Sequence, residues 1–139
     1  MYVVDASVRV SYFVPNDTFH LVSEEWVDQQ VERLEVIMSP TILLGEVSGA
    51  VSRRTGSSQR GNQGLALMLR LPNLQVVEID ADFARSSARL AADLRLRGAD
   101  ALYVALAQRL GVPLITWDQE QLQRGVAAVT ALTPEAALG

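Results

Sequence analysis

Four acidic residues stand where side chains can do chemistry. Asp5 and Asp118 each follow a short apolar run that predicts a strand. Asp100 begins an almost wholly apolar helix, and Glu46 lies inside another apolar helix, where an unpaired acid is costly. Since the carboxyl ends of parallel strands open onto one rim of a sheet, we expect the four acids to converge there.

Four neighbouring carboxylates repel one another unless protons or divalent cations neutralise them. Oxygen-only ligands suit Mg²⁺ or Mn²⁺, and such ions held by carboxylates commonly serve phosphodiester hydrolysis. The chain has no Cys and a single His, which excludes thiolate and multi-His zinc sites. It also has no Lys, which excludes Schiff-base chemistry and a phosphate-loop lysine.

Each acid also has a purely structural interpretation, and the sequence leaves both open. Asp5 suits a helix N-cap, and Asp118 followed by Gln121 fits a capping box. Asp100 lies near a helix start, where the helix dipole stabilises a negative charge. Glu46 has two candidate ion-pair partners, Arg53 and Arg54, about two turns further along its helix.

The overall charge indicates a small protein without a broad basic surface. The 139 residues carry 12 basic and 16 acidic side chains, a net charge of −4, which speaks against nonspecific nucleic-acid binding. No apolar run approaches the ~20 residues of a membrane span, and the N-terminus does not resemble a secretory signal. We therefore expect a cytoplasmic protein.

Alternating apolar runs and amphipathic stretches predict one domain over residues 1–139. The runs predict strands near 2–4, 35–38, 76–79, 114–116 and 127–132. Helical spacing predicts helices over 19–34, 40–56, 58–71, 80–98 and 99–110, with Ser39-Pro40 as N-cap and first helical residue. This alternation predicts a three-layer α/β/α sandwich with a mainly parallel sheet.

Four sequence blocks resemble the PIN domain family, most closely the VapC-type toxin ribonucleases. The blocks cover nearly the whole chain: Val4-Asp5-Ala6-Ser7, Ser39-Pro40 through Gly45-Glu46-Val47, Gly98 to Ala107, and Gly111 to Asp118. The resemblance implies a metal-dependent endoribonuclease that cuts single-stranded RNA, leaves a 5′-phosphate and a 3′-hydroxyl, and pairs with a small antitoxin protein. It also implies a homodimer.

Carried over residue by residue, the resemblance assigns Asp5, Glu46, Asp100 and Asp118 to the catalytic, metal-binding acids, with Mg²⁺ or Mn²⁺ as cofactor. Ser7 and Thr116 match the supporting hydroxyl positions, which otherwise read as a helix cap and a strand residue. Gly45 departs from the family, where Ala is common, and the first helix lacks a lysine that many relatives carry.

Four further residues are candidate RNA contacts. Arg53, Arg54 and Arg60 flank a Gly/Ser-rich loop and can steer phosphates, although a solvated surface explains them as well. Trp117 adjoins Asp118 and can stack a base, although packing explains it equally. The helices at 19–34 and 41–71 carry surplus apolar residues, and we expect the antitoxin there.

Other functions fit parts of the same pattern. A phosphorelay receiver also gathers acids at strand ends, but it relies on a lysine that this chain lacks. A PIN-type RNA-processing nuclease outside a toxin–antitoxin pair and a catalytically silent PIN-like binding module remain as alternatives.

Overall fold

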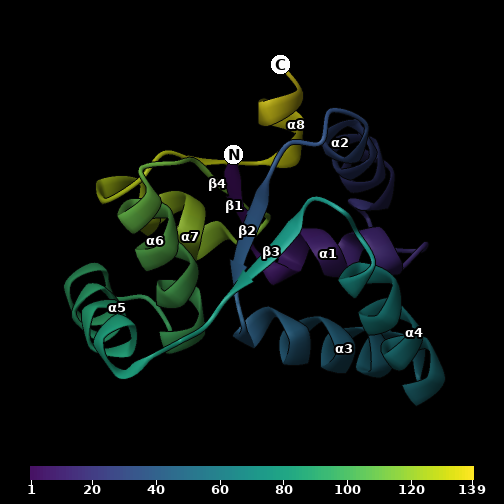
Figure 1. Cartoon of the computed structure of the whole chain (residues 1–139), viewed down its shortest axis with the longest axis horizontal. Helices are drawn as coiled ribbons and strands as arrows, with labels where there is room; N and C mark the ends of the chain where they lie inside the picture. The colour runs from purple at the N-terminus through teal and green to yellow at the C-terminus, as the bar shows by residue number, and fades with distance from the viewer.

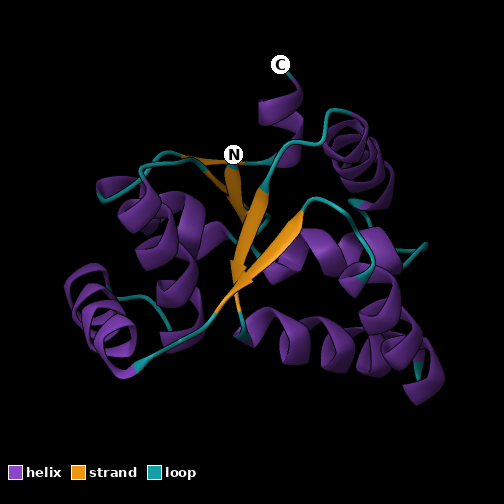
Figure 2. Ribbon diagram, in the orientation of Figure 1, coloured by secondary structure: helices purple, strands orange, loops and turns teal.

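The computed structural model describes residues 1–139, and a parallel five-stranded sheet forms its centre. The strand order is β3-β2-β1-β4-β5, and every neighbouring pair is parallel (Figure 2). The strands are short: β1 (Tyr2–Val4), β2 (Ile37–Pro40), β3 (Leu74–Val77), β4 (Leu114–Ile115) and β5 (Ala131–Leu132). Parallel strands need crossover connections, and helices supply them here.

Eight helices and one 3₁₀ turn surround the sheet (Figure 1). They are α1 (Ala6–Phe13), α2 (His20–Glu32), α3 (Ile42–Thr55), α4 (Ser58–Leu69), α5 (Ala81–Leu94), α6 (Gly98–Leu110), α7 (Gln119–Arg124), the 3₁₀ turn η1 (Gly125–Ala127) and α8 (Pro134–Leu138). The predicted three-layer α/β/α sandwich is confirmed. None of the helices has the length and apolar character needed to cross a bilayer.

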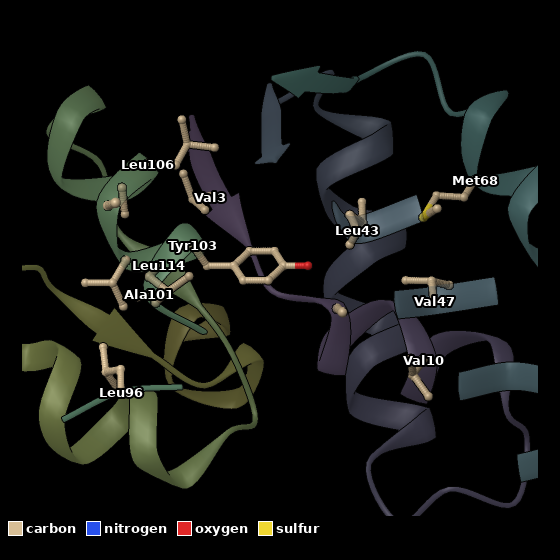
Figure 3. Packing of buried hydrophobic residues seen from close by; sticks show 14 of the residues in the cluster. Val3, Val10, Leu43, Val47, Met68, Leu96, Ala101, Tyr103, Leu106 and Leu114 are labelled. Atoms are coloured by element: carbon tan, nitrogen blue, oxygen red, sulfur yellow. The ribbon is translucent and has the colours of Figure 1, made fainter. Parts of the chain in front are cut away.

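Two apolar clusters cover the opposite faces of the sheet, because successive strand residues point to opposite sides. Val3 and Leu114 face the larger cluster, which includes side chains of α1, α3, α4, α5 and α6. Val4 and Ile115 face the smaller cluster, which includes Trp26 of α2. Figure 3 shows part of the larger cluster, with the ring of Tyr103 between the β1 and α6 residues and those of α3.

The prediction that Ser39-Pro40 begins a helix is wrong, because both residues form the end of β2. They pair with Val76 and Val77 of β3, and the Ser39 Oγ donates to the carbonyl of Val4 at 2.7 Å. The Thr41 N–H then donates to the Val77 carbonyl. Sheet pairing therefore overrides the local capping signal, and α3 starts two residues after the proline.

Two other predicted boundaries are wrong. The helix capped by Asp80 ends at Leu94 rather than Gly98, because Arg95 adopts a left-handed conformation (φ 55°) and closes it. Gly98 instead opens α6. The predicted last strand is reduced to Ala131–Leu132, since Ala127 ends the 3₁₀ turn and residues 128–130 form an irregular turn.

Candidate active site

The acids converge where the order of the sheet reverses. The chain runs from β1 outward to β2 and β3, then returns to place β4 on the other side of β1. In open parallel sheets, ligands bind in the crevice at such a point. A cleft of about 760 Å³ opens there, and its lining includes Asp5, Glu46, Asp100 and Asp118. The structure therefore gathers all four predicted acids in one cleft.

Asp5 is both the N-cap of α1 and part of the cleft, so its two interpretations are compatible. Its Oδ2 accepts from the Ser7 N–H at 3.0 Å and from the Thr116 hydroxyl at 3.2 Å. Its Oδ1 accepts from the Gln121 amide at 3.0 Å. Burial raises the pKa of Asp5 above its ordinary value, although hydrogen bonds from Ser7 and Gln121 oppose the shift.

Gln121 is a site residue that the sequence analysis missed. It is fully buried, and its Nε2 donates to Asp100 Oδ1 at 3.1 Å as well as to Asp5. Its Oε1 is buried without a hydrogen-bond partner. The capping-box pattern of Asp118 and Gln121 is the signal in the sequence that pointed to this position. Asp118 Oδ1 accepts from the Gln121 N–H at 2.8 Å, as that pattern predicts. The glutamine side chain, however, donates to Asp5 and Asp100 instead of to the backbone N–H of Asp118.

Glu46 is fixed by Tyr103, an aromatic residue in the apolar run of α6. The phenol donates to Glu46 Oε1 at 2.6 Å from a fully buried ring. Burial raises the pKa of Glu46, and the charges of Asp5 and Asp100 raise it further, while the phenol opposes the shift. Burial and the nearby carboxylates raise the pKa of Tyr103, so the phenol keeps its proton and remains a donor.

Arg97 joins the two remaining acids, and sequence reasoning missed this contact too. Its Nε donates to Asp100 Oδ2 at 2.9 Å, and a terminal nitrogen donates to Asp118 Oδ2 at 3.0 Å. The hydrogen bond and charge of Asp100 raise the pKa of Arg97. The arginine side chain is 69% exposed, so it can leave these carboxylates without disturbing the core.

The predicted supporting hydroxyls lie beside the acids. The Thr116 Oγ1 donates to Asp5 and accepts from the Asp118 N–H at 2.9 Å. The Ser7 Oγ lies 3.4 Å from Thr116 Oγ1 and accepts from the Trp117 N–H at 3.0 Å. These bonds connect the turn after β4 to the start of α1, which fixes Asp5 relative to Asp118.

The predicted RNA contacts divide between two places. Arg53, Arg54 and Trp117 line the cleft together with the acids. Arg60 lies in the first turn of α4, where its N–H donates to the Ser57 side chain, and it is not part of the cleft lining. Arg54 pairs with Asp17 at 2.9 Å rather than with Glu46.

The donor set suits a hard divalent cation, since the cleft offers four carboxylates and neither histidine nor cysteine. With the side chains as placed, no three acids are close enough to hold one ion together. Nitrogen donors of Arg97 and Gln121 instead bridge the pairs Asp100–Asp118 and Asp5–Asp100. An ion therefore needs Arg97 to withdraw and the carboxylates to close around it.

Comparison with known families decides the classification. A family model described as the PIN domain matches residues 2–127. The chain belongs to the PIN domain family. The predicted membership of the PIN family is thereby confirmed, and no curated protein sequence matches this PIN domain.

Solved structures share the fold of this PIN domain at low sequence identity. VapC20 from Mycobacterium tuberculosis, a toxin that cleaves the sarcin-ricin loop, has 18% identity and a TM-score of 0.77, over 94% of this chain and 97% of that one. FitAcB from Neisseria gonorrhoeae has 17% identity and a TM-score of 0.73, over 97% and 99%. VapBC2 from Rickettsia felis, bound to a promoter DNA fragment, has 14% identity and a TM-score of 0.70, over 95% and 97%.

Proposed function

We propose that this PIN domain is an Mg²⁺- or Mn²⁺-dependent endoribonuclease that hydrolyses single-stranded RNA. The observation that carries the proposal is the convergence of Asp5, Glu46, Asp100 and Asp118, from four separate segments, in the crevice of a PIN fold. Because like charges so placed repel, the cleft favours a divalent cation as their common partner. The nuclease chemistry follows from the family and from this donor set.

In this proposal the four acids hold the cation, which lowers the pKa of a water molecule and stabilises negative charge on the phosphate when bound. Thr116 and Gln121 orient Asp5, and Tyr103 orients Glu46, through the hydrogen bonds described above. Such supporting contacts fix ligand geometry at metal sites. Ser7 ties the turn that carries Asp118 to α1.

The RNA backbone enters along the wall that α3 contributes. Arg53 and Arg54 line this wall and supply positive charge to phosphates. Arg60 remains a proposed RNA contact outside the cleft. Arg97, once displaced from the acids, is also free to meet a phosphate oxygen.

The test is cleavage of labelled single-stranded RNA by Asp100→Asn, with Asp82→Asn as matched control. Asp82 is an exposed acid on α5 that pairs with Arg85 and lies outside the cleft. We expect Asp100→Asn to remain folded and lose cleavage, and Asp82→Asn to cut like the unmodified protein. EDTA abolishes the activity, and Mg²⁺ or Mn²⁺ restores it. Full cleavage by Asp100→Asn refutes the assignment.

We also propose that the protein is the toxin of a toxin–antitoxin pair, acts in the cytoplasm and forms a homodimer. Support comes from the fold, which it shares with the toxin VapC20 and with a toxin–antitoxin complex from Klebsiella pneumoniae. Exposed leucines, Leu21 on α2 and Leu67 and Leu69 on α4, lie on the helices predicted to receive an antitoxin. A short upstream reading frame whose product co-purifies with this chain supports the pairing; its absence favours an RNA-processing nuclease.

A further inference from the structure

The cleft contains an aromatic stack that the proposed chemistry does not use. The rings of Phe19 and Trp117 lie parallel, with centroids 4.0 Å apart and planes 9° apart. The two other close ring pairs of the protein, Tyr2–Trp26 and Tyr12–Phe13, meet edge to face. Both stacked residues line the same cleft as the four acids.

The Trp117 ring is held rigidly beside the acids. Its indole N–H donates to the Ser23 Oγ at 2.8 Å, and this hydroxyl lies 2.6 Å from the Ser11 Oγ. Its backbone N–H donates to Ser7. Trp117 directly precedes Asp118, so their Cα atoms are about 3.8 Å apart. The stack therefore keeps a fixed position next to the acids.

Phe19 forms the outer layer of the stack. It is 40% exposed, whereas Trp26 and Phe83 are fully buried. Since the indole covers one face of the phenyl ring, its exposure comes from the other face and the edges. Its backbone N–H donates to Asp17 at 2.8 Å, and Asp17 pairs with Arg54 of α3, which also lines the cleft. The ring is thus presented to the cleft and tied to its arginine side.

Resting on the proposed nuclease function, we infer that the outer face of Phe19 is a nucleobase-stacking subsite next to the scissile phosphate. A nucleotide combines a flat base with an anionic phosphate, and the cleft offers a flat ring beside acids suited to a cation. Arg53 lines the same cleft and pairs with no carboxylate, so it is available to a flanking phosphate. Every base has a π-face, so stacking here binds single-stranded RNA with little sequence preference.

The two stacked rings have different roles in this proposal. Trp117 is the candidate that its position next to Asp118 suggests, but Phe19 covers one face of its indole. Trp117 therefore supports the platform, and Phe19 contacts the base.

The experiment measures RNA binding rather than cleavage, with a short single-stranded RNA that carries 2-aminopurine at successive positions. All variants are made in an Asp5→Asn protein, so that the RNA is not cut during the measurement. Stacking quenches 2-aminopurine. Trp117 emission is a second signal, since the only other tryptophan, Trp26, is fully buried. Phe19→Leu keeps the indole covered but removes the flat face. Phe19→Tyr retains the flat face, and Val126→Ala, at an exposed apolar residue of η1 outside the cleft, is the matched control.

We expect Phe19→Leu to weaken RNA binding about 5- to 140-fold, the range that corresponds to ~1–3 kcal/mol per stacked base. Phe19→Tyr and Val126→Ala should bind RNA like the background protein, and an abasic nucleotide at the quenched position should reproduce the loss. Unchanged affinity in Phe19→Leu, or equal binding of abasic RNA, overturns the inference. So does a Phe19→Leu protein that binds RNA normally but no longer co-purifies with an antitoxin, which would assign the stack to a protein partner.

The two proposals fail separately. If the unmodified protein with Mg²⁺ or Mn²⁺ cuts no RNA while binding still depends on Phe19, the nuclease assignment falls and the base subsite stands. If cleavage occurs and Phe19→Leu neither weakens RNA binding nor abolishes quenching, the subsite falls and the nuclease stands.

Discussion

Replacing Tyr103 with Phe tests whether the buried phenol holds Glu46 in its ionised form. The substitution keeps the ring in the core and removes one hydroxyl, whose hydrogen bond to Glu46 Oε1 is 2.6 Å long. A hydrogen bond to a charged group contributes ~1.5–3 kcal/mol. For a chain of this size we therefore expect Tyr103→Phe to lower the melting temperature by about 5–10 °C at neutral pH.

The pH dependence of Tyr103→Phe follows from the same bond. The phenol lowers the pKa of Glu46 against the effect of burial, so its removal raises that pKa further. The acid limb of the cleavage profile should then move to higher pH. The difference in stability from the unmodified protein should shrink as the pH falls, because a protonated Glu46 gains less from the phenol.

Tyr12→Phe is the matched control for this experiment. Its hydroxyl also donates to a carboxylate, Asp28, but at 3.4 Å and in an exposed position. A surface change of this kind alters stability by less than about 0.5 kcal/mol. Thermal melts and pH–rate profiles of both variants give the answer. Equal melting temperatures for the two variants, or an acid limb that does not move in Tyr103→Phe, would refute the reasoning.

Three further changes probe the cleft and the helices around it. Arg97→Ala should tighten Mn²⁺ binding in calorimetry, because the guanidinium and the ion compete for the same carboxylates, whereas Arg85→Ala on α5 should leave it unchanged. Burial raises the pKa of Asp5, so the folded protein binds a proton at Asp5 more readily than the unfolded chain does. Asp5 therefore lowers the stability of the metal-free protein as the pH rises above the ordinary pKa of an aspartate. In EDTA, the melting temperature of Asp5→Asn should decline less with rising pH than that of the unmodified protein. Gly61→Ala should lower the free energy of unfolding by ~1–3 kcal/mol, since the added Cβ would lie 2.6 Å from the Ser48 carbonyl oxygen. At Gly45 an added Cβ meets nothing within 4 Å, so Gly45→Ala should raise the free energy of unfolding by up to ~1 kcal/mol. Denaturant unfolding measures both changes.

The sequence allowed the four acids to be located because their positions at strand ends and in apolar helices are local signals. Their partners are not visible in the same way. Tyr103 lies in an apolar run, where packing explains an aromatic residue fully. The contact of Gln121 with Asp5 spans 116 residues and depends on how α7 docks.

Local signals also misled where tertiary contacts outweigh them. Ser39-Pro40 has the composition of a helix start, yet pairing with β3 makes it the end of a strand. Phe19 precedes an amphipathic helix and carries no chemical signal of its own. Its position against Trp117, 98 residues later in the chain, arises only when α2 and the turn after β4 come together.

The distribution of the site along the chain affects how the protein behaves while it is being made. Asp118 and the residues that hold Asp5, Thr116 and Gln121, follow Asp5 by more than 100 residues, and β1 lacks its β4 neighbour until they are translated. A ribosome-bound polypeptide that stops before residue 114 therefore has an incomplete set of acids. In terms of the proposed activity, such an unfinished chain lacks Asp118, one of the four acids that would hold the cation.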